Sequence, residues 1–183
     1  MNQAAHKNQY SKGANDNAAG VGSVLALAEY YSKNPPKRLR LGFLFTGAEE
    51  TGTHGAKVFA RQLAKICGKK FVVNLDMVGS GETQCFVGKE GSLFARRTDR
   101  KLNRLLMDVN PEMKSIQYLF RSGNFSPFIK LGIPATSIET TGSQEATIAY
   151  HSIFDDIHRI NRRSLVGVMS TLIKFIDQLP YIY

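Results

Sequence analysis

The chain has 183 residues, a length typical of one domain, and its 43% hydrophobic and 21% charged residues exclude global disorder. Two cysteines, Cys67 and Cys85, exclude a disulfide framework and a zinc site of paired CxxC motifs. No apolar run reaches the roughly 18–20 residues of a membrane span, and the N-terminus lacks a signal-peptide core. We therefore expect one domain over residues 1–183, with residues 1–12 interpreted as a flexible or truncated segment. We expect a cytoplasmic protein by default, or an exported one if the N-terminus is truncated.

The net charge of +9 raises the question of a nucleic-acid ligand. The densest basic cluster falls at helical spacing opposite leucines and comprises Arg96, Arg97, Arg100, Lys101 and Arg104. Such a charge row is typical of a solvated helix face. No RNP motif, aromatic stacking platform or helix-turn-helix pattern accompanies it, so we expect no nucleic-acid partner.

In the first half of the chain, amphipathic stretches alternate with short apolar runs. The predicted elements are a helix from Asn15 to about Ser32, a buried strand Leu39–Thr46, a helix Gly55–Cys67, a strand Phe71–Asp76 and a short strand Gln84–Val87. The first helix ends because Asn34 is followed by two prolines. Gly68 closes the second helix.

The second half continues the alternation. The predicted elements are a basic helix Leu93–Val109, a strand Ser115–Phe120, a helix Phe125–Leu131, a strand Ile133–Glu139 and a long helix Asn161–Leu179. Strands that are apolar runs and alternate with helices are typical of a mostly parallel sheet covered on both faces. The sequence therefore predicts an α/β fold with three α/β/α layers.

Acidic residues collect where the predicted strands end. Glu49 and Glu50 follow the strand Leu39–Thr46, and Asp76 closes the next strand. Asp16 begins the first helix, and His151 follows the loop after Glu139. Ligands gather beyond the carboxyl ends of strands in such folds, and oxygen and imidazole donors suit zinc or another divalent transition ion.

Five motifs occur in an order that resembles one family. They are GANDNAAG (13–20), FTGAEETGTHGA (45–56), NLDMVG (74–79), GIPA (132–135) and YHSIFDD (150–156). From about Gly13 to Leu179 the chain resembles the co-catalytic zinc aminopeptidases of the bacterial leucyl aminopeptidase and aminopeptidase Y type. Glutamate carboxypeptidase and the glutaminyl cyclases are related to these enzymes. The resemblance implies a zinc-exopeptidase fold.

The resemblance also implies a role for each matching residue. Asp16 bridges two metals, and Glu50 and His151 complete the ligands of one of them. Asp76 binds the other metal. Glu49 is the general base that takes a proton from the attacking water. Asp155 matches a family position and is a candidate for supporting the ligands. Tyr150, the neighbour of His151, is a candidate for lining the pocket or for structural support.

The chain departs from the family pattern at its N-terminus. The second metal's histidine usually stands in an Ala-His-x-Asp segment, and here only His6 is available, with Asn8 in place of the aspartate. We therefore expect one tightly bound Zn²⁺ and a second that is weak or absent. Relatives carry a non-proline cis bond after the bridging aspartate, so the bond between Asp16 and Asn17 is predicted to be cis.

The implied activity is that of a metal-dependent exopeptidase acting on peptides with a free N-terminus. A glutaminyl-cyclase-like transferase with one zinc is an alternative, because it needs only Asp16, Glu50 and His151. A degenerate relative that acts as a binding module is a second alternative. Glu49 argues against it, since a binding module has no use for a general base.

Overall fold

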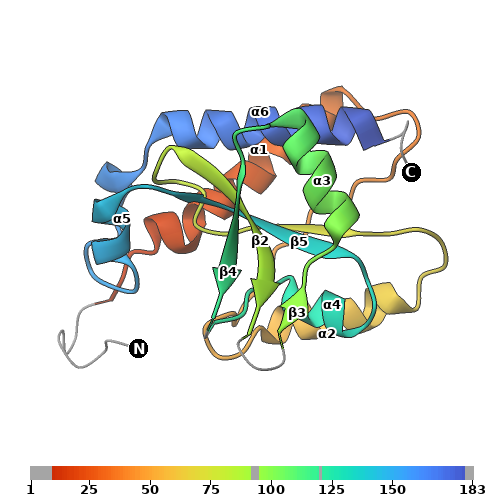
Figure 1. Ribbon diagram of the computed structural model, residues 1–183, viewed down its shortest axis with the longest axis horizontal. Coiled ribbons are helices and arrows are strands. Elements are labelled where there is room, and N and C mark those ends of the chain that lie inside the picture. The colour runs from red at the N-terminus through yellow and green to blue at the C-terminus, as the bar shows by residue number, and fades with distance from the viewer. Residues whose placement is uncertain (1–9, 92–94, 120, 180–183) are drawn as a thin grey trace. The chain divides into compact units, whose positions relative to one another are not determined.

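The computed structural model describes residues 10–91, 95–119 and 121–179 (Figure 1). The helical elements are η1 (Ala14–Ala18), α1 (Ala19–Lys33), α2 (His54–Ala64), α3 (Arg100–Val109), α4 (Ser126–Lys130), α5 (Gln144–Ala149), η2 (Ile157–Arg159) and α6 (Arg162–Gln178). The strands are β1 (Val72–Leu75), β2 (Thr83–Glu90), β3 (Arg96–Arg97), β4 (Lys114–Tyr118) and β5 (Ala135–Thr141). This confirms the predicted α/β class.

The strands form one open, mixed sheet. Its order is β1-β5-β2-β3, and β4 also pairs with β2. Strand β2 runs parallel to β4 and antiparallel to β3. The register between β2 and β4 shifts between Val87 and Lys89, which marks a β-bulge at Gly88.

The chain divides into two compact units. The first unit comprises Met1–Phe43, Leu75–Gln84 and Glu139–Tyr183, and the second comprises Leu44–Asn74 and Cys85–Ile138. In the first unit α1 packs along α6 (Figure 1), because both helices carry an apolar stripe at helical spacing. Leu27 and Tyr31 on α1 and Val168 and Leu172 on α6 are buried.

The core of the second unit lies where α2 and α4 pack together (Figure 1). Ala56 and Ala60 present a small-residue face of α2, while Phe125 and Phe128 fill the space at α4. Val87, Tyr118, Ile133 and Ala135 complete this buried cluster from the strands and the loop before β5. A core of this size needs no covalent cross-link, and within the described part of the chain Cys67 and Cys85 form no disulfide.

The predicted buried strand Leu39–Thr46 is wrong. This segment is irregular. Phe43, Leu44 and Phe45 are exposed, Phe45 to 48%, while Leu39 and Leu41 are half-buried. Among the described residues, no neighbouring strand offers it a backbone ladder. An apolar run becomes a strand only where a partner accepts and donates its backbone hydrogen bonds.

The predicted helix Leu93–Val109 begins later than expected. Residues 92–94 lie outside the described residues, and Arg96–Arg97 forms β3 opposite the end of β2. The helix starts at Arg100, because the carboxylate of Asp99 accepts the backbone N–H of Leu102 at 2.9 Å and caps it. The basic cluster is therefore shared between a strand and a helix.

The other predicted elements are confirmed, with ends displaced by a few residues. The short elements α5 and η2 are additional.

In the part of the chain that the structure describes, no helix combines the length and apolar character needed to cross a membrane.

Candidate metal centre

Asp16 lies in η1, at the entrance to α1, in the first unit. Its backbone is not helical, with φ −114° and ψ 87°, and the bond that joins it to Asn17 is cis, which confirms that prediction. The carboxylate of Asp155 accepts the backbone N–H groups of Asn15 at 2.7 Å and of Asp16 at 3.0 Å. Asp155 is 2% exposed, so its two hydrogen bonds replace its hydration and hold the Asp16 backbone in place.

The two asparagines beside Asp16 attach this turn to the segment that carries Asp76. The Asn17 amide donates to the carbonyl of Leu75 at 2.8 Å, and its oxygen accepts the N–H of Met77 at 3.3 Å. The side-chain oxygen of Asn15 accepts the N–H of Gly79 at 2.8 Å. Asp76 is therefore flanked by backbone groups that are fixed to the neighbours of Asp16.

His151 approaches the same place from the loop after α5. Its Nε2 lies 3.2 Å from a carboxylate oxygen of Asp16, and its side chain is 29% exposed. The ring of Tyr150 stacks on the imidazole, with the centroids 3.8 Å apart and the planes at 22°. The imidazole is thus held by a carboxylate on one side and an aromatic face on the other.

Glu139, which the sequence analysis did not select, adds a buried carboxylate near the end of β5. It is 3% exposed. Burial, followed by the negative charges of Asp76 and Asp16, raises the pKa of Glu139 to about 9. The ends of β1 and β5 therefore place a buried carboxyl group close to two half-buried carboxylates, those of Asp76 and Asp16.

Backbone strain collects at the predicted site residues. Four described residues other than glycine have positive φ: Ala48 (58°), Thr53 (55°), Met77 (49°) and His151 (53°). Three of them are His151 itself and the neighbours of Glu49 and Asp76. This conformation costs about 1–3 kcal/mol per residue and persists where the surrounding structure imposes it, most often at functional sites.

Glu49 and Glu50 belong to the second unit, where they lie in the turn that precedes α2. The backbone carbonyl of Glu49 accepts the N–H groups of Gly52 and Thr53, both at 2.8 Å. Glu49 is half-buried, whereas Glu50 is exposed. The two adjacent glutamates in this turn therefore differ in their exposure to solvent.

The first unit thus brings together Asp16, Asp76, His151 and Asp155 from the predicted set. His6 lies outside the described residues. Glu139, Asn15 and Asn17 were missed. Glu139 had a usable signal, since it stands near the end of a strand like Asp76, but nothing local in the sequence tells which backbone groups an asparagine will bind.

The donors in this unit fit a divalent metal ion. They are carboxylate oxygens and one imidazole nitrogen, the ligand types of Zn²⁺ in hydrolases. The raised pKa of Glu139 is the sign of negative charge that a cation would compensate. A second carboxylate, on Asp155, orients the backbone beside Asp16, as the outer groups of metal sites commonly do.

Comparison with known proteins identifies the family to which this chain belongs and solved structures that share its fold. The model of peptidase family M28 matches residues 4–176. A vacuolar membrane protease of Kluyveromyces lactis is 30% identical over 148 residues, which cover 80% of this chain and 15% of that protein. The chain therefore spans about one sixth of the length of such curated relatives.

Solved structures share the fold at low sequence identity. A zinc aminopeptidase from Bacillus subtilis is 20% identical, with a TM-score of 0.73, over 91% of this chain and 42% of that one. The glutaminyl cyclase of Tannerella forsythia is 18% identical, with a TM-score of 0.64, over 91% of this chain and 64% of that one.

Proposed function

Because the chain belongs to peptidase family M28, we propose that it carries the metal centre of an exopeptidase that removes N-terminal residues from peptides. The observation that carries the proposal is the carboxylate–imidazole set of the first unit. Asp16 lies 3.2 Å from His151, is fixed beside the Asp76 segment, and shares its surroundings with the buried Glu139.

In this proposal Asp16, Glu50 and His151 hold the first Zn²⁺, and Asp16 and Asp76 contribute to a second. Aspartate, glutamate and histidine are the oxygen and nitrogen donors that catalytic zinc takes. When bound, zinc would polarise the scissile carbonyl as a Lewis acid. Asp155 keeps Asp16 in its orientation through the two backbone N–H groups it accepts.

Glu49 is assigned the proton transfers. Its carboxylate accepts a proton from the attacking water and returns it to the leaving amine, so a single group serves as base and then as acid. Two observations support this role: Glu49 is half-buried, and the turn that carries it is closed by two hydrogen bonds to its own carbonyl. Tyr150 is assigned to supporting the His151 ring, on which it stacks.

A glutaminyl-cyclase-like activity is the second candidate. The fold likeness to the Tannerella forsythia enzyme favours it, and Asp16, Glu50 and His151 are the residues that a single-metal centre needs. The two reactions give different products. A peptidase releases a free amino acid and a shortened peptide, whereas a cyclase releases ammonia and leaves the peptide chain intact.

The test uses the zinc-loaded full chain with a tripeptide library and an N-terminal glutamine peptide, analysed by mass spectrometry and an ammonia assay. We expect shortened peptides from free N-termini and none from the same peptides after N-acetylation. Cleavage of acetylated peptides would contradict an aminopeptidase. Ammonia without shortened peptide would establish the cyclase instead.

A further inference from the structure

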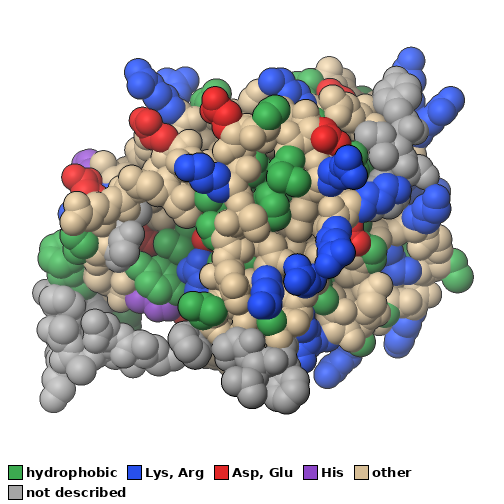
Figure 2. Space-filling model, in the orientation of Figure 1, with side chains coloured by type: hydrophobic (Ala, Val, Ile, Leu, Met, Phe, Trp, Pro, Cys, Tyr) green, Lys and Arg blue, Asp and Glu red, His purple; other side chains and the backbone are tan. Residues whose placement is uncertain are grey.

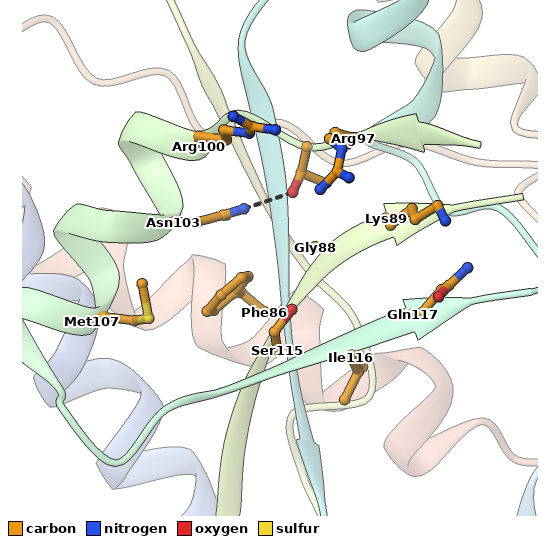
Figure 3. Close-up of a pocket in the computed structure, with 11 residues that line it drawn as sticks. Phe86, Gly88, Lys89, Arg97, Arg100, Asn103, Met107, Ser115, Ile116 and Gln117 are labelled. Carbon is orange, nitrogen blue, oxygen red and sulfur yellow. Dashed lines mark hydrogen bonds between the residues drawn. The ribbon is translucent and has the colours of Figure 1, made fainter.

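A concave site lies in the second unit and shares no residue with the candidate metal centre. It is a pocket of about 510 Å³ between β2, β3, β4 and α3 (Figure 3). Three cationic side chains line it: Lys89, Arg97 and Arg100. No Asp or Glu is among the described residues that line it.

The pocket has a basic end and an apolar end. In Figure 3 the side chains of Arg97 and Arg100 lie near one another at one end, and Met107 lies at the other. Phe86 lies beside Met107 in the same view, and it is 6% exposed. A ligand that fits both ends has charged groups attached to a small carbon skeleton.

The bulge in β2 directs Lys89 to this pocket. In a regular strand, residues two apart share a face, so Lys89 would point with Val87 into the apolar cluster of the second unit. The register shift after Val87 instead places both Gly88 and Lys89 on the pocket side. Bulges that re-aim a side chain in this way are common beside functional sites.

Lys89 also stands directly opposite another cation on the neighbouring strand. In the antiparallel pairing of β2 with β3, Lys89 stands opposite Arg97, whereas the next pair, Glu90 and Arg96, has opposite charges. Like charges in directly opposite positions destabilise a sheet. Among the described residues, none of Lys89, Arg97 and Arg100 has an ion-pair partner, so the repulsion is not relieved within this part of the chain.

The surrounding structure holds the basic end rigidly. Thr136 donates to the side-chain oxygen of Asn103 at 2.6 Å, and the Asn103 amide donates to Thr98 at 2.7 Å. All three residues are buried, and they connect β5 to the first turn of α3 and the end of β3. Arg97 and Arg100 therefore project from a backbone that is fixed before any ligand arrives, which lowers the entropy lost on binding.

We propose that this pocket binds a small organic anion with at least two negative charges, either phosphate or carboxylate groups. Guanidinium groups match both by paired, charge-assisted hydrogen bonds. The volume lies within the range of small-molecule sites. Figure 2 shows further Lys and Arg side chains over β3 and α3, a field that attracts anions.

A small anion is favoured over a nucleic acid. The pocket is bounded by three strands and a helix. Among the described residues that line it, Phe86 carries the one aromatic ring, which is almost fully buried. A single strand of nucleic acid needs exposed rings on which bases stack.

The test is calorimetry on the zinc-loaded full chain with fructose 1,6-bisphosphate, propane-1,2,3-tricarboxylate, inorganic phosphate and neutral fructose. We expect binding of the bisphosphate or the tricarboxylate, with the tighter of the two identifying the anionic group, and none of fructose. Arg97→Gln and Arg100→Gln should each weaken binding about tenfold or more. Arg96→Gln, the neighbour on β3 that does not line the pocket, should leave it unchanged.

A second readout is the thermal stability without ligand. Arg97→Gln relieves the repulsion with Lys89 and should raise Tm by about 1–3 °C, which Arg96→Gln should not do. Equal affinity in Arg97→Gln and Arg96→Gln would overturn the proposal. So would binding that Asp16→Asn abolishes, since the anion would then sit at the metal centre, or tighter binding of an RNA oligonucleotide than of either small anion.

Discussion

Glu139 is the residue in which burial and charge conflict most directly. Its carboxyl group is removed from water and lies in the field of Asp76 and Asp16, so in the absence of a cation it keeps its proton at neutral pH. A bound divalent ion reverses this balance, because the ion favours the charged form of every carboxylate around it. Protonation of Glu139 and metal binding therefore oppose one another.

The pH dependence of stability follows from this shift. The pKa of Glu139 is about 9 in the folded chain and 4.5 without the fold, so between these values the folded state binds the additional proton. The free energy of unfolding of the metal-free protein must then fall as pH rises from about 4.5 to about 9. We expect Tm, measured with a chelator present, to drop by several degrees between about pH 6 and pH 8.5.

Glu139→Gln provides the control for this effect. The amide has the same size but does not titrate. The Tm of the metal-free variant should therefore change much less with pH than that of the wild type, and it should exceed the wild-type Tm at the alkaline end. Parallel pH curves for the two proteins would show that another group dominates. With zinc bound, the Tm of the wild-type protein should also change less with pH.

The adjacent carboxylates Glu49 and Glu50 should respond differently to the same substitution. Glu49→Gln cannot accept a proton, so turnover should fall about 10²–10⁴-fold or more while the zinc content stays near that of the wild type. Glu50→Gln should lower the zinc content first, because it weakens a direct ligand. Steady-state kinetics beside metal analysis of the dialysed proteins measures both, and identical zinc content in the two variants would refute the division of roles.

At the scale of elements, the site depends on how the turn before α1 is attached to the end of β1. Asn17 makes this attachment through Leu75 and Met77, and its side-chain oxygen also accepts the N–H of Gly20 in α1. Asn17→Ala should cost about 1–3 kcal/mol of unfolding free energy, since partly buried backbone groups lose their partners. Urea denaturation measures the loss, and Asn34→Ala, which removes an exposed hydrogen bond at the end of α1, serves as the matched control with a smaller effect.

The elements differ in how far sequence could predict them. Helices α1 and α6 were predictable because their apolar residues repeat at helical spacing, a signal contained in the elements themselves. The segment Leu39–Thr46 has the composition of a strand, but composition does not reveal whether a partner strand is available. Strand β3 was missed for the opposite reason. Its two residues, Arg96 and Arg97, do not have the composition of a strand, and they form one only because the fold places them opposite the end of β2.

The same distinction holds for the site. Asp16, Asp76 and His151 were selected because motifs carry them in a fixed order, and the structure brings Asp16 and His151 together. The roles of Asn15, Asn17 and Asp155 depend on contacts with backbone groups about 60–140 positions away. No local pattern contains that information.

At the scale of the whole molecule, metal loading should change stability measurably. We expect calorimetric titration of the metal-free protein with Zn²⁺ to show one tight site and a second that is weak or absent. Zinc at about 100 times its Kd would add about 2.7 kcal/mol, which corresponds to roughly 5–10 °C in Tm for a chain of this length.

His6→Ala is the matching variant for that titration. It should change occupancy of the tight site little, because Asp16, Glu50 and His151 are its proposed ligands. Two equally tight sites in the wild type, both lost in His6→Ala, would contradict this expectation. They would show that the N-terminal segment binds metal as part of the centre.

The metal-centre residues of the first unit are far apart along the chain, and this has a consequence for biosynthesis. During synthesis Asp16 and Asp76 are therefore added to the chain well before Glu139 and His151. A nascent chain that has reached Asp76 carries two of the proposed metal-binding carboxylates but neither the histidine nor Glu139. In the proposed centre, tight zinc binding would therefore follow folding of the segment that carries His151 rather than precede it.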